Sequence, residues 1–314
     1  MILAADFGGT TIKLGLVQAG RVIARDRIDA GADRPMTERL EAVARAGEAL
    51  LQGQGRGLAD CTGLALALPF LTDPRQLRVH GEFGKFPGAT AIDFGAWSRR
   101  RLGLPVALEN DLRVALLGEW AAGAGRGKDT VVMLALGTGI GCAAMAGGRL
   151  LCGANNRAGT LLGHATVDWD GETGRCGNPG CAEDLASTAT LAARAAERAD
   201  FAGSRLAGAG KIDFAKLFLL ADEGDACSQA VLQQGLRVWS VVVQNAVLAY
   251  DPDVVVLGGG VLRRADIVLP AMRQQLQKQL TGLTWATPVV AATLADDAAL
   301  LGGEVLFRQV HPGL

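Results

Sequence analysis

The sequence predicts an α/β protein made of two related domains, each built on a mixed β-sheet. The first observation is length, because 314 residues are long for a single hydrophobic core. The second is composition, since 49% apolar residues are enough to bury large cores and argue against disorder. The third is an internal repeat of strands and glycine turns. We therefore expect two folded domains of one architecture.

The internal repeat consists of two similar stretches, residues 3–22 and residues 134–150. Each begins with a short apolar strand, turns through Gly and Thr, and continues as a second strand. Each also ends in a Gly-Arg turn before a third strand. The same β-meander therefore occurs twice, which predicts two related domains that face each other.

Helical patterns alternate with strands outside the repeat. Apolar spacing predicts a helix over residues 36–52 and a long buried helix over residues 226–250. Buried strands are predicted in "CTGLALALP", in "PVALEN" and in "DPDVVVLGGGV". A helix is expected from about Asp111, with that residue as its N-cap, and the last helix covers about residues 296–309. This alternation indicates mixed sheets.

Charge and cysteine content limit the partners and the compartment. The formal net charge of −1 gives no reason to expect nucleic acid or an anionic membrane as a partner. The opening "MILAA" is too short for a signal peptide, and no apolar stretch approaches the roughly 20 residues of a membrane-spanning helix. The 6 cysteines form no framework, which suits a reducing compartment. We expect a cytoplasmic protein.

Three predicted strands end in glycine-rich turns, and glycine lets backbone N–H groups approach an anion closely. The turns are Gly8-Gly9-Thr10, Gly137-Thr138-Gly139 and Gly258-Gly259-Gly260. None matches the Walker P-loop or, in its context, the dinucleotide fingerprint. Asp6, just before the first turn, is placed to hold Mg²⁺ or its water shell, with capping of the turn as the alternative. The three turns predict one nucleotide held between two lobes.

Several motifs together resemble the ROK family, which comprises sugar kinases and sugar-responsive repressors. They are "DFGGTTIK" (6–13), "LENDLRVALLGE" (108–119), "LALGTGIG" (134–141), "GH" (163–164), "CGNPGCAE" (176–183) and "DPDVVVLGGGV" (251–261). The resemblance implies a two-lobed, actin-like (ribonuclease H-like) ATPase fold with duplicated mixed sheets. The expected small lobe is residues 1–112, joined by the C-terminal helix at about 296–314, and the large ATP-binding lobe is residues 113–295.

The resemblance also implies ATP-dependent phosphorylation of a sugar or sugar-like polyol, with Mg²⁺. Asp111 would be the catalytic base, and an ionised carboxylate at a strand end is chemically able to accept the proton of an attacking hydroxyl. The residues implied to contact Mg²⁺, phosphates or adenosine are Asp6, Gly8, Gly9, Thr10, Lys13, Gly137, Thr138, Gly139, Gly258 and Gly259. For Lys13, simple exposure on the second strand is the alternative.

The residues implied for the substrate pocket are Asn110, His164 and Glu183, with Lys85 and Leu161 at diverged positions. Leu161 stands where the family's Glu-x-Gly-His element has its glutamate, so a sugar-binding acceptor is lost. Because an unpaired hydroxyl disfavours binding, we expect a different hexose, a deoxy or amino-modified sugar, or a cyclitol. Lys85 and Arg113, which replaces a usual Asn, could suit an acidic sugar or lie on a solvated surface.

The cysteine loop matches three of four zinc ligands of its relatives: His164, Cys176 and Cys181. Gly174 stands where the first cysteine belongs. Three ligands could hold a structural Zn²⁺ with water or Asp170 in the fourth position, or the loop has lost its metal and kept its turn. Bound zinc would orient the His164 imidazole. Redox pairing of the two cysteines is disfavoured, because their spacing is not Cys-x-x-Cys.

Two other functions remain to be weighed within the family. We expect no helix-turn-helix domain, because Asp6 already belongs to the first phosphate motif, and the near-neutral charge argues against DNA binding. A catalytically inactive sugar sensor of the same fold is the alternative to a kinase, and an assay of ATP consumption separates the two. Dimerisation is common among relatives, although no helix marks an interface here, so a homodimer stays open.

Overall fold

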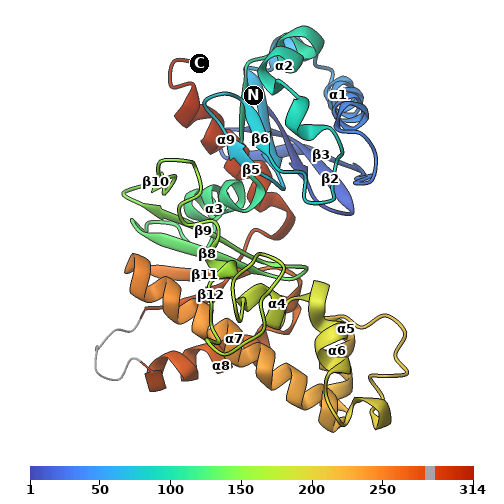
Figure 1. Cartoon of the computed structure of the whole chain (residues 1–314). Helices are drawn as coiled ribbons and strands as arrows, with labels where there is room; N and C mark the ends of the chain where they lie inside the picture. Colours follow the sequence, from blue (N-terminus) through green and yellow to red (C-terminus); the bar gives the residue numbers. More distant parts are fainter. Residues whose placement is uncertain (280–286) are drawn as a thin grey trace. The chain divides into compact units, whose positions relative to one another are not determined.

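The computed structural model describes residues 1–279 and 287–314 (Figure 1), and this part of the chain forms two compact units. Unit 1 comprises Met1–Gly127, Leu151–Ala158 and Thr293–Leu314, and unit 2 comprises Lys128–Leu150 and Gly159–Ala292. The predicted boundary after residue 112 stays a prediction. Among the described residues, no helix has both the length and the apolar character required to cross a membrane.

Unit 1 contains a five-stranded mixed sheet in the order β3-β2-β1-β4-β7. Its first three strands form an antiparallel meander, and β4 and β7 continue the sheet parallel to β1. The strands are β1 (Ile2–Phe7), β2 (Thr11–Gln18), β3 (Arg21–Asp29), β4 (Gly63–Leu68) and β7 (Val106–Asn110). A separate hairpin pairs β5 (Leu71–Asp73) with β6 (Arg78–His80). The first predicted meander is therefore confirmed.

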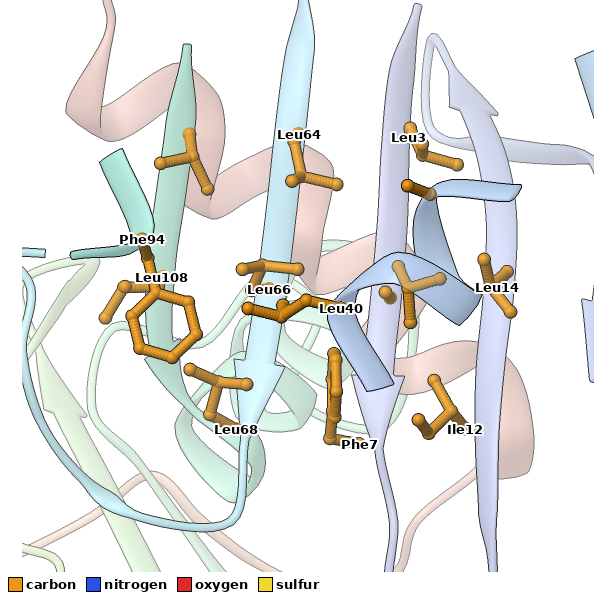
Figure 2. Packing of buried hydrophobic residues seen from close by; sticks show 14 of the residues in the cluster. Leu3, Phe7, Ile12, Leu14, Leu40, Leu64, Leu66, Leu68, Phe94 and Leu108 are labelled. Carbon is orange, nitrogen blue, oxygen red and sulfur yellow. The ribbon is translucent and has the colours of Figure 1, made fainter. Parts of the chain in front are cut away.

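The two faces of this sheet bury different residues because successive side chains of a strand alternate. Leucines and phenylalanines of the strands pack with Leu40 of α1 (Met36–Gln52) and Phe94 of α2 (Phe94–Leu102), as Figure 2 shows. The opposite face carries small residues such as Ala4 and Ala65, whose Cβ atoms lie about 3 Å from the place of a Cβ on Gly303. Small residues thus allow α9 (Ala298–Val310) to lie close to the sheet.

The helix α3 (Asp111–Ala122) packs against α9 inside unit 1. The contact is close because a Cβ on Gly118 would meet the backbone of Ala298, and one on Gly302 would meet the backbone of Val114. The predicted N-cap at Asp111 is wrong. Asn110 caps α3, since its Oδ1 accepts from the N–H groups of Leu112 (3.2 Å) and Arg113 (3.3 Å). Asp111 is already the first helical residue.

Unit 2 repeats the same sheet in the order β10-β9-β8-β11-β12. Its strands are β8 (Val131–Leu136), β9 (Ile140–Ala146), β10 (Arg149–Leu150), β11 (Val254–Gly258) and β12 (Val289–Ala291). The first three again form an antiparallel meander, and the last two run parallel to β8. The duplication predicted from the sequence and the mixed α/β fold class are confirmed.

The helices of unit 2 are α4 (Ala182–Ala186), α5 (Thr188–Ala196), α6 (Phe214–Asp222), α7 (Ala226–Tyr250) and α8 (Ala265–Gln279). The predicted long helix is α7, which packs on β8 and β11. Short 3₁₀ turns cover Leu58–Asp60, Ala89–Ala91, Leu162–His164, Phe201–Gly203, Gly260–Arg264 and Ala295–Asp297. The last of these turns precedes α9, so the final helix begins at Ala298 rather than at the predicted residue 296.

Candidate active site

Two predicted site carboxylates, Asp6 and Asp111, lie at one edge of the sheet of unit 1. Asp6 is near the end of β1, and Asp111 follows the last residue of β7. Both strands run parallel to β4 between them, so their carboxyl ends meet at the same edge. This edge is where open α/β sheets bind ligands.

Asp111 has the electrostatic character of a base. Burial is the largest effect, and together with the nearby charge of Asp6 it raises the Asp111 pKa from 3.8 to about 6. The rise is opposed by the Leu112 N–H, which donates to Oδ1 at 2.8 Å, by the charge of Lys85 and by the Asn110 amide at 3.0 Å. At neutral pH the carboxylate is therefore ionised and more basic than an ordinary aspartate.

Asp6 is mostly buried, and burial raises its pKa above the ordinary value despite the opposing charge of Lys13. The Lys13 ammonium lies 3.3 Å from Asp6 Oδ2 and 3.1 Å from Asp296 Oδ1. Lys13 is thus held between two carboxylates at the edge of the sheet. The carboxylate oxygens of Asp6 fit Mg²⁺, which proteins commonly bind through one or two carboxylates together with phosphate oxygens.

The first glycine turn joins β1 to β2 and begins at Gly8, two residues after Asp6. The Gly8 N–H donates to the carbonyl of Thr11 at 3.2 Å, which closes the turn. Gly9 and Thr10 are exposed at its tip, so their backbone is open to a ligand. Lys85, from the loop after β6, approaches this tip, with Nζ 3.6 Å from the place of a Cβ on Gly9.

Asn110 uses both ends of its amide within the protein. Its Oδ1 caps α3, and its Nδ2 donates to the carbonyl of Phe70 at 3.2 Å and to Asp111 Oδ1 at 3.0 Å. The residue therefore positions Asp111 in addition to any contact with a substrate.

The two predicted glycine turns of unit 2 lie together. The Gly137-Thr138-Gly139 turn joins β8 to β9, and the place of a Cβ on Gly137 is 3.7 Å from the Gly260 nitrogen. Gly259 has φ +89°, and a Cβ there would collide with the backbone of Leu136 at the end of β8. Only glycine adopts this positive φ readily and also has no Cβ to collide with Leu136. Gly258, the last residue of β11, completes this cluster of backbone.

Glu183 lies beside the same cluster of unit 2. Its Oε2 accepts from the Ile140 N–H at 2.9 Å, directly after the turn, and a Cβ on Gly139 would collide with its carboxylate. Leu161 is 43% exposed, next to the 3₁₀ turn that contains His164. Leu161, which was predicted to replace a sugar-binding acceptor, is therefore an exposed apolar side chain.

The predicted metal ligands of unit 2 also come together. One ligand atom each from His164, Cys176 and Cys181 lies within 4.8 Å of the other two, and His164 Nδ1 is 3.7 Å from Cys181 Sγ. Two thiols and an imidazole are the donors that Zn²⁺ prefers. The residues present thus fit zinc at three of its four positions.

The space beside Gly174, where the missing cysteine side chain would lie, is taken by a carboxylate. Asp170, the suggested substitute, is not part of the group formed by the described residues. It lies in an exposed turn where its N–H donates to Asp168. Asp184 occupies the place of the missing cysteine side chain, because a Cβ on Gly174 would meet its Oδ2. The Asp184 carboxylate is bound to Arg175, with Nε 2.8 Å from Oδ1.

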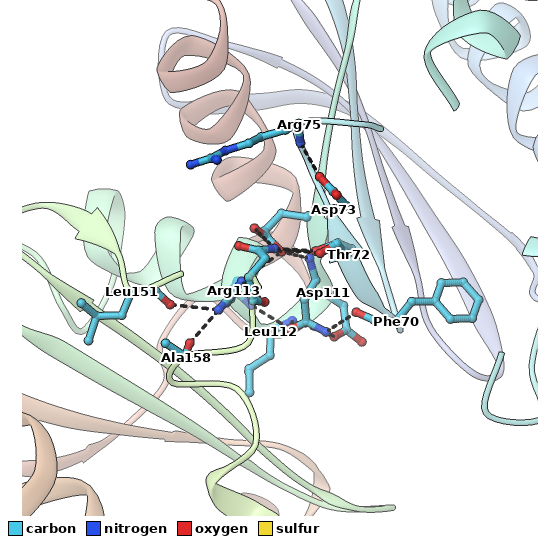
Figure 3. Close-up of polar contacts among 12 residues, drawn as sticks. Phe70, Thr72, Asp73, Arg75, Asp111, Leu112, Arg113, Leu151 and Ala158 are labelled. Carbon is cyan, nitrogen blue, oxygen red and sulfur yellow. Dashed lines mark hydrogen bonds and ion pairs between the residues drawn. The ribbon is translucent and has the colours of Figure 1, made fainter. Parts of the chain in front are cut away.

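Arg113 shows that one interpretation of the sequence was wrong. It is fully buried, so it is not part of a solvated surface. Its guanidinium donates to the carbonyls of Leu151 (2.9 Å), Asn156 (3.1 Å) and Ala158 (2.6 Å), as Figure 3 shows in part. Both terminal nitrogens of Arg113 are therefore hydrogen-bonded within the protein. Arg113 therefore holds the segment 151–158 in unit 1 and is not placed to grip an acidic sugar.

The charge of Arg113 is balanced by Glu109, which sequence reasoning missed. Arg113 Nη1 lies 3.4 Å from Glu109 Oε1, and both side chains are buried. The Glu109 carboxylate also accepts from Thr72 Oγ1, from the Asn110 N–H at 2.7 Å and from Asn156 Nδ2 at 3.2 Å. The spacing of four residues between Glu109 and Arg113 could have indicated an ion pair. That spacing usually indicates a pair within one helix, whereas here Glu109 lies on β7 and Arg113 on α3.

Comparison with known proteins agrees with this architecture. The ROK family matches residues 2–310. The chain is 30% identical to a glucokinase of Halalkalibacterium halodurans, over 98% of this chain and 94% of that protein. A ROK hexokinase from Thermus thermophilus has a similar structure, with a TM-score of 0.82, 30% identity and coverage of 99% of both chains.

A second solved structure was obtained with ligands. It is a ROK family glucokinase from Streptomyces griseus in complex with glucose and AMPPNP. Its TM-score is 0.76 at 28% identity, and the alignment covers 98% of this chain and 99% of that chain. The similarity therefore extends over the whole fold and is not confined to single motifs.

Proposed function

The chain belongs to the ROK family and is a carbohydrate kinase, and from this premise we propose a reaction mechanism and a substrate class. In the proposed reaction, ATP phosphorylates a hydroxyl of a sugar or sugar-like polyol, with Asp111 as the general base. The observation that carries the proposal is the position of Asp111. Its raised pKa and its place beside Asp6 at the carboxyl edge of the sheet suit proton abstraction at neutral pH.

The chemistry of Asp111 in this proposal is proton transfer alone. The attacking hydroxyl loses its proton to the carboxylate as the new oxygen–phosphorus bond forms and the bond to the leaving ADP breaks. The Leu112 N–H and the Asn110 amide both donate to Oδ1 of Asp111 and hold it in place. The start of α3 therefore orients the carboxylate. A pKa of about 6 keeps the base ionised at pH 7.

The nucleotide is assigned to the glycine turns. In unit 2, Gly137, Thr138 and Gly139 supply backbone contacts to phosphates, and Gly258 and Gly259 adjoin the adenosine. In unit 1, Asp6 would hold Mg²⁺, and Gly8, Gly9 and Thr10 contribute the second phosphate turn. Mg²⁺, when bound, offsets the negative charge of the phosphates. Lys13 supports Asp6 through their ion pair.

The substrate is assigned to a pocket that differs from that of a glucose kinase. Asn110, His164 and Glu183 are the proposed polar contacts, and Leu161 is the apolar substitution that changes specificity. Loss of one acceptor disfavours a sugar whose hydroxyl it would have bound. A deoxy or amino-modified sugar, another hexose or a cyclitol therefore fits better. Replacement of Leu161 by Glu should increase kcat/KM for glucose.

A structural Zn²⁺ is part of the proposal. His164, Cys176 and Cys181 would hold it, and the bound ion would fix the loop and the direction of the imidazole. The Asp184 carboxylate beside Gly174 is bound to Arg175, so water would be the fourth ligand of the ion. A cytoplasmic location, where ATP is abundant, completes the assignment.

The deciding experiment is a coupled assay of ADP release with purified protein, MgATP and a panel of neutral sugars, amino sugars, acidic sugars and cyclitols. We expect at least one member of the panel to stimulate ATP consumption, with a phosphorylated product in the mass spectrum. The alternative, an inactive sugar sensor, would show no turnover with any compound while some sugar raises the melting temperature.

A further inference from the structure

The loop of residues 81–88, between β6 and the 3₁₀ turn at Ala89–Ala91, has an unusual backbone. Gly81, Phe83, Gly84, Phe86 and Gly88 all have positive φ, between 45° and 80°. Two of them are phenylalanines, for which the left-handed region is strained. Strained residues persist only where the surrounding structure holds them, and they gather at functional sites.

Phe86 anchors this loop beside the end of β1. Its side chain is fully buried, with ring centroids 5.6 Å from Phe7 and 6.2 Å from Phe70 in edge-to-face geometry. Its N–H donates to the carbonyl of Ala32 at 2.6 Å. Phe7 directly follows Asp6 in β1. The contact of Phe86 with Phe7 therefore fixes Lys85, the residue before Phe86, close to the first glycine turn.

Lys85 is half-buried at the edge of the sheet of unit 1. Its Nζ lies 3.6 Å and its Cε 3.8 Å from the place of a Cβ on Gly9. Within residues 1–279 and 287–314, Lys85 makes no ion pair, whereas Lys13 at the same edge is bound to both Asp6 and Asp296. The charge of Lys85 also lowers the pKa of Asp111, so the ammonium acts on the proposed base. A partly desolvated cation without a partner favours binding of an anion.

We propose that the Lys85 ammonium binds the phosphoryl group during its transfer. The proposal rests on the kinase function assigned above and adds a catalytic residue to it. The surrounding groups favour phosphate as the anion, because Lys85 lies against the exposed backbone of Gly9 in a phosphate-type turn. Its charge also acts on Asp111, whose pKa it lowers.

Lys85 neither gains nor loses a proton during the phosphoryl transfer. The sugar oxygen attacks the γ-phosphorus, its proton passes to Asp111, and the bond between phosphorus and the bridging oxygen of ADP breaks. The ammonium donates hydrogen bonds to the equatorial oxygens of the phosphoryl group, where negative charge is spread in the transition state. Lys85 also disfavours protonation of Asp111 before the reaction.

Two variants test the proposal in the full-length enzyme. Lys85→Met removes the charge and keeps the length, and Lys85→Arg keeps the charge. The control is Lys211→Met, because the Lys211 side chain is 86% exposed and forms a surface ion pair with nearby Asp213. Rates are measured with the best neutral sugar of the panel, and the affinities of Mg·AMPPNP and Mg·ADP are measured by calorimetry in its presence. Melting curves confirm that each variant is folded.

We expect Lys85→Met to lower kcat about 100-fold while the KM of the neutral sugar changes less than about threefold. The same variant should weaken AMPPNP binding and leave ADP binding unchanged, because only AMPPNP carries the γ-phosphate. Lys85→Arg should restore most of the AMPPNP affinity, and Lys211→Met should match the unmodified protein.

A Lys85→Met kcat within about threefold of the unmodified enzyme, with equal AMPPNP affinity, would overturn the proposal. A rise in KM confined to acidic sugars would also overturn it and assign Lys85 to the substrate. If the unmodified protein phosphorylates no sugar, the kinase function fails instead. The calorimetry is then run without sugar, and the difference between AMPPNP and ADP binding still tests Lys85 alone.

Discussion

The sheets of the two units have the same strand order and differ in what they carry at the carboxyl edge. In unit 1, the residue before the end of β1 is Asp6, and Lys13 lies opposite it on β2. In unit 2, the corresponding position of β8 is Ala135, with Gly141 opposite it on β9. At these paired positions unit 1 therefore carries two charged side chains, whereas unit 2 carries two small residues.

The proposed function assigns different roles to two copies of one architecture. Charged side chains can move protons and bind a metal ion, whereas closely packed glycine turns present backbone N–H groups to phosphates. The β11 turn of unit 2 reinforces this contrast, because Gly259 packs on the backbone of Leu136 where a side chain would not fit. Changes in unit 1 should therefore affect turnover more than nucleotide affinity.

Asp111→Asn is the most direct test of the different roles proposed for the two units. We expect kcat to fall by about 10² to 10⁴-fold, because the amide cannot accept the proton of the attacking hydroxyl. The affinity for ADP should stay within about twofold of the unmodified value, since the proposed ADP contacts belong to unit 2.

The matched control for that variant is Asp73→Asn, an aspartate of the β5–β6 hairpin outside the proposed machinery. Both variants are compared in steady-state rates and in ADP calorimetry. Substantial residual turnover of Asp111→Asn would exclude this residue as the base, and a parallel loss of ADP affinity would contradict the division between the units.

The next largest effect concerns the buried ion pair of unit 1. Arg113→Met should destabilise the protein by about 3–5 kcal/mol, because Glu109 is left buried with its charge uncompensated. The double variant Glu109→Gln with Arg113→Met should recover a large part of this loss. Urea denaturation of all variants measures the coupling between the two residues. A single Arg113→Met variant as stable as the unmodified protein would mean that the pair contributes no net stability.

A change of pH should have a smaller effect on turnover. The Asp111 pKa of about 6 means that the ionised base is lost as the pH falls through 6, and turnover should fall about tenfold at one unit below that value. The kcat/KM values for the sugar and for MgATP are measured from pH 5 to pH 8, because they report the base before the ternary complex forms. Lys85→Met should move the midpoint upward, because the charge of Lys85 lowers the Asp111 pKa. A flat profile over this range would contradict the assignment of the base.

The smallest effect on turnover is expected at the cysteine loop of unit 2. The purified protein should contain about one zinc per chain, and Cys176→Ser should lose it while kcat changes by less than about threefold. Elemental analysis and thermal melting provide the measurements, with Cys152→Ser as a control outside the group. Absence of zinc from the unmodified protein would show that the loop has kept its turn without its metal.

Residues near each other in the sequence account for most of what could be predicted. The helix at Met36–Gln52 follows from its own apolar spacing, and both meanders follow from alternation of strands with glycine turns. The grouping of His164 with Cys176 and Cys181 was likewise expected from a short motif. These features were accessible because their determining interactions are local or repeat a known pattern.

The amino-acid sequence was enough to predict the α/β class, the duplication and the residue types available for phosphate and proton chemistry. Three other features became visible in the folded chain: Arg113 is buried on the 151–158 segment, Lys85 lies against Gly9, and Asp184 fills the space beside Gly174. Each of these depends on groups brought together by folding, some from distant parts of the chain. The free energy of a charged side chain depends on those neighbours and on burial, and neither can be read from local spacing.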